Sequence, residues 1–267
     1  MKRQADSEID ILHGYNFSLP AIILSTVCLL LLSGCGLEEF FVLDSPVNVY
    51  HYSYYDSLYD NRYVEFSTNE NSSQMNSYLS PSSSFKFLGT AVYYKIYNDY
   101  STMSGRISSL GSLSSSKNES AAAASMIDSY GYKQLGLQQG TKTPLIEATG
   151  NDRKVYIRIS NYKENDSNEF TAEVVIDRKT SSESKLGTPR REGNRLTFDF
   201  GRTSKGDDNA IPLETDGDVT YTSSSSSSKW YIDLYAVAVG QDTSFTASYS
   251  NILHLGSIPI DPAEEDN

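Results

Sequence analysis

The clearest structural pattern in the chain is the stretch Lys154-Val155-Tyr156-Ile157-Arg158-Ile159-Ser160. Its valine and two isoleucines share one side of an extended chain, because successive side chains of a strand point to opposite faces. Such alternation is typical of a strand with one buried face. The pattern returns at 170–177 and 195–200. Weaker strand candidates lie at 47–55, 63–67, 86–97, 219–222, 230–239 and 245–249.

Polar clusters separate these candidates, at 69–73, 150–152, 163–166 and 205–208. Asn, Asp, Gly and Ser dominate them, and these residues favour turns. Many short strands joined by polar turns favour an antiparallel, mainly β fold. We therefore expect one or two antiparallel β-sandwiches, with a first β region at 40–100 and a second β-sandwich region at 136–259.

One segment, 101–135, breaks the strand pattern and is expected to be a short helical insertion. Ser116-Lys117-Asn118-Glu119 has the form of a capping box, in which side chains satisfy the free N–H groups of a first helical turn. Four residues then follow at the spacing i, i+3, i+4 and i+7, namely Ala123, Met126, Ile127 and Tyr130. This pattern predicts a helix of about fourteen residues that ends before Gly131. Upstream, a ragged apolar spacing favours a weaker helix or an ordered loop.

The first 34 residues have the pattern of a signal peptide. Residues 19–32 form an apolar run without a charged side chain. A membrane-spanning helix needs about 20 such residues, so this shorter run matches the apolar region of a secretory signal instead. We expect residues 1–34 to be cleaved during export.

The residues that end this run, Leu32-Ser33-Gly34-Cys35, resemble the bacterial lipobox. The resemblance implies that diacylglycerol is attached to the thiol of Cys35 and that the signal is cut before it. Acyl chains would then hold the protein at a membrane of the bacterial cell envelope, through a lipid tether of residues 35–39. An ordinary secretory signal is the alternative. Because Cys28 lies within the signal, the mature chain has no partner for a disulfide.

Two further resemblances concern the body of the protein. Residues 230–240 and 245–250 are similar to the last two strands of fibronectin type III modules, which implies an Ig- or fibronectin III-like sandwich. That similarity places four side chains inward, those of Trp230, Ile232, Leu234 and Ala236. The chain from 87 to 257 also resembles uncharacterised envelope lipoproteins of spirochaetes, a family without an established activity.

The chain is acidic, with 22 Lys and Arg against 34 Asp and Glu, and its formal net charge is −12. A negative overall field repels polyanions, so we expect no nucleic-acid partner. The C-terminal residues 260–267 have the composition of a disordered acidic tail.

Few residues of the mature chain offer catalytic or metal-binding chemistry. Only His51 and His254 remain as imidazoles, and both are expected to be structural, because a catalytic base needs a positioned nucleophile. Too few Cys and His remain for a metal site built from them. A cluster of acidic residues could offer oxygen ligands to Ca²⁺, but Asp-Gly is first of all a turn signal, so we expect a solvated turn with Gly217 at positive φ. The cluster comprises Asp207, Asp208, Glu214, Asp216 and Asp218. We expect no catalytic residue, no metal and no cofactor.

Tyrosines crowd one short segment, at Tyr50, Tyr52, Tyr54, Tyr55, Tyr59 and Tyr63. If several face outward, they form an amphipathic surface suited to a protein or glycan ligand. The alternative is that these tyrosines are ordinary strand residues with wet hydroxyl groups at the sheet margins.

These observations favour a lipid-anchored envelope or surface protein that acts as a binding or structural module and is not an enzyme. The alternative is a carbohydrate hydrolase, whose paired carboxylates would come from Glu65, Asp99, Glu173 and Asp233. A carrier of a small apolar ligand is a third possibility, which would need an internal cavity.

Overall fold

The computed structural model describes residues 41–51, 59–115, 119–140, 144–165, 168–192, 196–201 and 211–262, without the side chains of 51, 59, 119, 163–165 and 168. The expected signal peptide, the tether and Cys35 lie outside the described residues, as do residues 263–267 of the expected tail. Strands account for 38% and helices for 17% of the structure, so the mainly β fold is confirmed.

The smaller of the two large sheets has five strands, all antiparallel to their neighbours, in the order β1-β2-β7-β10-β11. Val64, Ile157 and Val174 are aligned across its three central strands. The strands are β1 (Val47–His51), β2 (Val64–Ser67), β7 (Lys154–Arg158), β10 (Glu173–Ile176) and β11 (Ser184–Gly187).

The seven-stranded sheet is built around a long antiparallel pair, β3 (Phe85–Tyr97) and β14 (Trp230–Asp242). Their register runs from Tyr97 opposite Tyr231 to Phe85 opposite Asp242. Three short strands pair with the free edge of β3, namely β4 (Lys133–Gln134), β6 (Ile146–Glu147) and the parallel β13 (Val219–Thr220). The free edge of β14 pairs with β15 (Ala247–Tyr249) and β16 (Leu253–Ile260).

The remaining elements are short. Two small antiparallel pairs are β5 (Gly136–Leu137) with β12 (Pro189–Arg190), and β8 (Tyr162–Asn165) with β9 (Asn168–Phe170). A 3-10 turn, η1 (Tyr59–Asn61), precedes β2, and a short helix, α2 (Ser73–Ser77), follows it.

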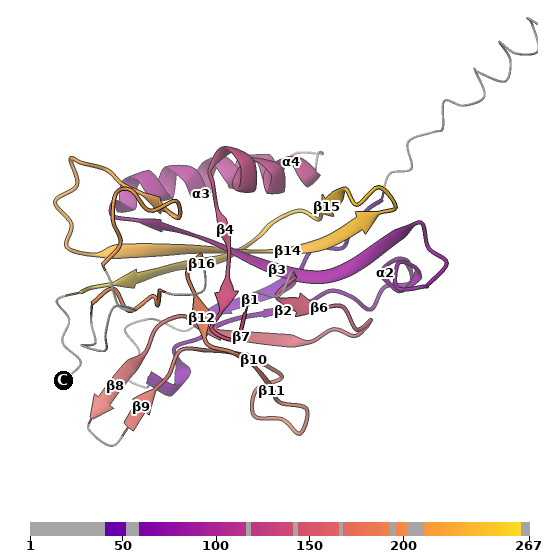
Figure 1. The fold of residues 1–267 in the computed structure, drawn as a ribbon, viewed down its shortest axis with the longest axis horizontal. Coiled ribbons are helices and arrows are strands. Elements are labelled where there is room, and N and C mark those ends of the chain that lie inside the picture. Colours follow the sequence, from indigo (N-terminus) through magenta and orange to yellow (C-terminus); the bar gives the residue numbers. More distant parts are fainter. Residues whose placement is uncertain are drawn as a thin grey trace, which may run out of the picture. The chain divides into compact units, whose positions relative to one another are not determined.

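The main core lies between the two large sheets. Ile157 and Val174 of the five-stranded sheet pack in the same cluster as Tyr94 and Ile96 of β3. The four residues expected to point inward belong to this core, so that prediction is confirmed. The pair of sheets is therefore a sandwich (Figure 1).

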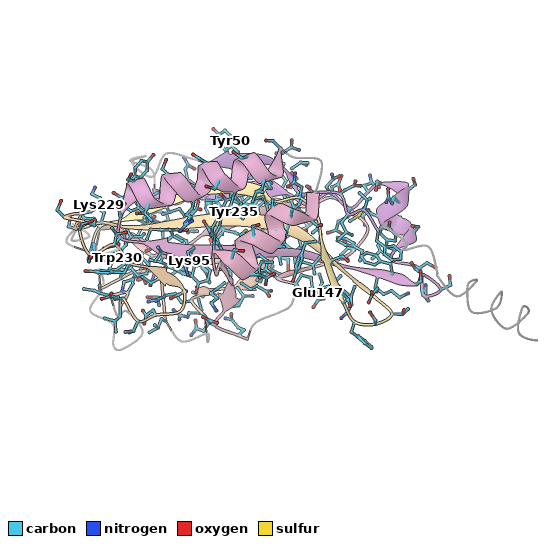
Figure 2. All side chains as sticks on the ribbon, turned by 90° about the horizontal axis from the view of Figure 1, so that it is seen from above. Tyr50, Lys95, Glu147, Lys229, Trp230 and Tyr235 are labelled. Carbon is cyan, nitrogen blue, oxygen red and sulfur yellow. The ribbon has the colours of Figure 1, made fainter. Side chains whose placement is uncertain are left out.

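Helices cover the other face of the seven-stranded sheet (Figures 1 and 2). They are α3 (Tyr100–Ser114), α4 (Glu119–Ala124) and the π-helical turn η2 (Ser125–Ser129). Ala123 and Met126 are buried against this face, which confirms the predicted helix, although residues 116–118 of its capping box lie outside the described residues. Because β3 and β14 are covered on both faces, their sequences are almost continuously apolar and do not alternate.

The two expected β regions do not form separate bodies. Strands from 40–100 and from 136–259 lie side by side in both large sheets, and the described residues from Phe41 onward form one compact unit. Of the two possibilities, the structure has one sandwich.

Two local predictions from the sequence are wrong. The segment 196–201 forms bends and turns and no strand, with Phe200 at a φ of 51°. Burial of Phe198 and Phe200 explains its apolar pattern, because buried side chains need not belong to a strand. Ile260 is the last residue of β16, so the expected tail does not begin before residue 261.

Candidate functional site

The two tyrosines of the Tyr-rich segment whose side chains are described differ in exposure and do not form one exposed face. Tyr50 on β1 is 55% exposed, whereas Tyr63 is only 1% exposed. Tyr52, Tyr54 and Tyr55 lie outside the described residues, as does the side chain of Tyr59. The expectation of an outward-facing or wet tyrosine is therefore wrong for Tyr63.

Tyr63 is held between two cationic side chains on the outer face of the five-stranded sheet. The guanidinium carbons of Arg158 and Arg178 lie 4.2 Å and 4.3 Å from its ring centroid, and its hydroxyl donates to Glu173 Oε1. Burial raises the pKa of Tyr63. Burial also acts to raise the pKa of Glu173, but hydrogen bonds from Lys185 and Tyr63 outweigh it and leave the pKa below its usual value. This cluster stabilises the sheet through cation–π and ionic contacts.

The four carboxylates considered for hydrolysis do not converge. Asp99 accepts a hydrogen bond from the backbone N–H of Thr102 and so caps α3. Glu65 pairs with Lys154 at 3.2 Å, and β7 separates its strand from the one that carries Glu173. Asp233 belongs to the other sheet. Paired acids of a glycosidase must face each other across about 5–9.5 Å, and these four share no such site.

Asp233 lies in a buried polar cluster beneath the helical layer. Tyr132 donates to its Oδ2 at 2.5 Å and accepts from Tyr97 at 3.1 Å, while Nε2 of His254 lies 2.8 Å from Oδ1. Burial raises the pKa of Asp233. A carboxylate that orients a histidine is typical of general bases and metal ligands. Within the described part of the chain, however, Asp233 is the one hydrogen-bond partner of the His254 imidazole, and no Ser, Thr or Cys side chain is bonded to that ring.

The acidic turn near Gly217 is not the solvated turn that the sequence predicts. Arg191, 1% exposed, donates from Nε and Nη2 to both oxygens of Asp218 at 2.9 Å and 2.7 Å, and from Nη2 to Asp216 at 2.7 Å. Gly217 does not have a positive φ. Burial acts to raise the pKa of Asp218, but Arg191 outweighs it and holds the pKa below its usual value. Asp218 is therefore structural.

Calcium binding gains no support from the same turn. Asp216 and Asp218 are paired with Arg191, and Asp207 and Asp208 lie outside the described residues. Where side chains are described, no group of three or more His, Cys, Asp or Glu could hold a metal ion.

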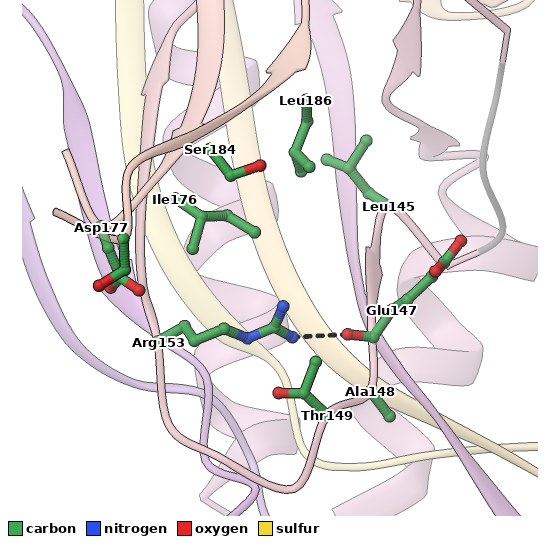
Figure 3. Close-up of a pocket in the computed structure, with 10 residues that line it drawn as sticks. Leu145, Glu147, Ala148, Thr149, Arg153, Ile176, Asp177, Ser184 and Leu186 are labelled. Carbon is green, nitrogen blue, oxygen red and sulfur yellow. Dashed lines mark hydrogen bonds between the residues drawn. The ribbon is translucent and has the colours of Figure 1, made fainter.

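A cavity opens at one edge of the sandwich, between β6 of one sheet and β11 of the other (Figure 3). Its volume is about 360 Å³. Leu145, Ile176 and Leu186 line it with aliphatic groups, and the hydroxyls of Thr149, Ser182 and Ser184 lie among its polar wall. Figure 3 shows the guanidinium of Arg153 pointing into it.

Arg153 is fixed at the wall of this cavity through its Nη2 group. Its Nη2 donates to Glu70 Oε1 at 3.0 Å and to the carbonyl oxygen of Glu147. Glu70 is fully buried and also accepts from the backbone N–H groups of Thr149 and Gly150. The Nε–H of Arg153 is buried without a partner. Glu70 balances the positive charge of Arg153, and the wall also carries Glu147 and Asp177, so the cavity suits a ligand without negative charge whose polar groups lie beside an aliphatic group.

This cavity is the site that the sequence did not predict. Its wall combines 145–153 with 176–186, and each segment alone has the pattern of a strand end or a turn. The one local signal is an arginine directly after the polar turn at 150–152.

None of the helices in the described parts of the chain is both long and apolar enough for a membrane crossing. Comparison with protein-family models, with curated proteins and with solved structures finds no match to this chain.

Proposed function

We propose that this protein is a lipid-anchored component of the bacterial cell envelope whose β-sandwich body acts as a binding or structural module. The observation that carries the proposal is the apolar run 19–32 that ends in Leu32-Ser33-Gly34-Cys35, only six residues before the compact body begins at Phe41. Each buried CH₂ of an acyl chain contributes about 0.8 kcal/mol to membrane attachment, so two or more chains on Cys35 give a stable anchor.

A binding role is supported by the edge cavity. Its wall sets the Arg153 guanidinium and the Ser and Thr side chains, which favour a carbonyl or hydroxyl oxygen, beside aliphatic groups, which favour a methyl or ring face. Glycans and peptides combine these groups. A hydrolase gains less support, because Glu65, Asp99 and Glu173 serve an ion pair, a helix cap and the Tyr63 cluster.

Replacing the lipid acceptor tests the anchor. We expect Cys35→Ser to move the protein from the detergent phase to the aqueous phase when cells expressing the full chain are extracted by detergent partition. The matched control is Cys28→Ser, which changes the other cysteine of the chain, within the expected signal. It should leave the protein in the detergent phase. Recovery of Cys35→Ser with the membrane fraction would contradict lipid attachment at this residue.

A blocked cavity tests the ligand site. The full-length protein is screened against glycan and peptide arrays beside Ser184→Phe, whose ring would fill the cavity (Figure 3). Ser181→Phe is the control, because Ser181 is exposed in the turn that precedes β11 and does not line the cavity. We expect at least about tenfold weaker binding for Ser184→Phe alone, the loss of about 1.4 kcal/mol or more. Equal binding by wild type, Ser184→Phe and Ser181→Phe would mean that the ligand binds outside the cavity. If none of the three proteins binds a ligand, the structural role is favoured.

A further inference from the structure

The hairpin between β14 and β15 exposes a single aromatic ring at its tip. Phe245 is 80% exposed, more than any other large apolar side chain in the described part of the chain. The next most exposed, Leu213, is at 60%. An aromatic ring is normally buried or covered by a partner, because its apolar area is large.

The backbone at this tip makes the choice of Phe more unusual. Phe245 has a φ of 64°, a conformation that Gly and Asn adopt more readily than other residues. Asp242 holds the turn in place, since its Oδ1 accepts from the backbone N–H groups of Ser244 and Thr246, both at 2.9 Å. Gly or Asn would adopt this backbone conformation at a lower cost than Phe does.

The tip lies at the same end of the body as the first described residue. Phe41 stacks on Phe85 with ring centroids 4.4 Å apart, and Phe85 is the register partner of Asp242. Asp242 is three residues before Phe245 and accepts a hydrogen bond from its N–H. In Figure 1, the β14–β15 turn lies beside the start of β3 at this end. The six Cα–Cα steps from Cys35 to Phe41 span at most about 21 Å, however the chain is arranged.

We infer that Phe245 inserts into the interfacial region of the lipid bilayer that carries the protein, so that the hairpin is a second membrane contact beside the acyl chains. This inference rests on the proposed lipid anchor at Cys35. A short tether confines the hairpin end to the neighbourhood of the bilayer surface, and an aromatic side chain is stabilised at the boundary of headgroups and acyl chains. The contact would orient the body with its Trp230 end away from the membrane.

A tryptophan in place of Phe245 reports on this contact. The full-length lipidated protein and its Phe245→Trp variant are reconstituted into phosphatidylcholine vesicles with or without brominated acyl chains, which quench indole fluorescence at short range. Trp230 is the one native tryptophan and lies at the far end of β14, about 40 Å away at 3.3 Å per residue. We expect brominated lipid to remove the emission that the new tryptophan adds, and to leave the Trp230 emission unchanged.

A matched variant and the anchor mutant separate the possible failures. Tyr100→Trp places a new indole at the opposite end, where Tyr100 is 59% exposed and packs on Tyr231. It should not be quenched. If Phe245→Trp is unquenched while the protein sediments with the vesicles, the hairpin contact is wrong and the anchor stands. If the protein does not sediment with the vesicles, or Cys35→Ser sediments equally well, the proposed anchor itself is wrong.

Discussion

Buried charges in this protein are stabilised by specific partners. Arg191 donates from Nε and Nη2 to Asp218 and from Nη2 to Asp216, and Tyr94 donates to Asp218 at 2.7 Å. Glu70 and Arg153 form a second buried pair. Removing one member of such a pair leaves an uncompensated charge, which costs about 3–5 kcal/mol.

Asn in place of Asp218 should lower the free energy of unfolding by about 3–5 kcal/mol at neutral pH, because Arg191 loses its buried counter-charge. The folded pKa of Asp218 lies below its ordinary value, so the unfolded chain takes up the proton first as the pH falls. The stabilisation by Asp218 is therefore complete above the ordinary aspartate pKa of about 3.9 and is lost as the pH falls through the folded value.

Urea denaturation at neutral and acid pH measures this effect. The difference in the free energy of unfolding between wild type and Asp218→Asn should be smaller at acid pH than at neutral pH. Asp216→Asn is the control, because the Asp216 side chain is 24% exposed, and it should lose less unfolding free energy than Asp218→Asn. A gap that is the same at both pH values would contradict a role for ionised Asp218.

At the scale of elements, the helical layer approaches the sheet closely because α4 is made of alanines. Ala122 and Ala123 are fully buried in the cluster that also holds Ala91 and Val237 of β3 and β14. Ala124 is exposed. Small side chains on one face allow the helix to lie directly on the strands, and this contact, more than the helix propensity of so short a segment, stabilises it.

Leucine at position 123 should lower the free energy of unfolding by about 1–3 kcal/mol, because the packed contact has no room for three more carbon atoms. Leucine at position 124 is the matched control and should change stability by no more than about 0.5 kcal/mol, since that side chain faces solvent. Chemical denaturation followed by circular dichroism compares the two. Equal stabilities would mean that α4 does not rest on the sheet.

At the scale of the whole molecule, the order of strands in space differs from their order in the chain. β3, before the helices, pairs over its whole length with β14, more than 130 residues later, and β2 pairs with β7. Both sheets thus need both halves of the chain. Neither half can bury its apolar faces without the other.

Unfolding should therefore be a single cooperative transition. Fluorescence of Trp230 reports on the core between the sheets, and far-ultraviolet circular dichroism reports on all strands and helices. The two signals should give the same denaturant midpoint for the folded body. Two separate midpoints would contradict one body and support two independent sandwiches.

The strands and helices that the sequence predicted share one property, a regular local spacing. The alternation at 154–160 predicted β7, and the helical spacing at 123–130 predicted α4 and η2. The segment 196–200 also alternates but forms bends, with the carbonyl oxygen of Leu196 accepting from the N–H of Arg191. Local spacing shows which side chains are buried and not which backbone groups are paired.

The spacing of neighbouring residues could not predict the buried ion pairs or the edge cavity. Arg191 meets Asp218 across 27 positions, Glu70 meets Arg153 across 83, and the cavity joins two sheet edges. From the sequence, Asp218 had the pattern of a solvated turn residue, and Tyr63 that of a member of an exposed cluster or of a strand residue with a wet hydroxyl. Only packing decided that both are buried, because a charge or hydroxyl can leave water where distant parts of the chain supply its partners.

Sequence by itself thus determined the mainly β character, the helical insertion and the inward residues of β14, because each follows from the period of neighbouring side chains. The signal and lipobox pattern is likewise written in a short linear stretch, and it remains a prediction. Tertiary structure alone decided that the chain forms one sandwich, that its carboxylates are used for pairing and capping, and that Arg153 faces a cavity. These features depend on residues that are distant in the chain and meet only when the apolar faces of two sheets and a helical layer are buried together.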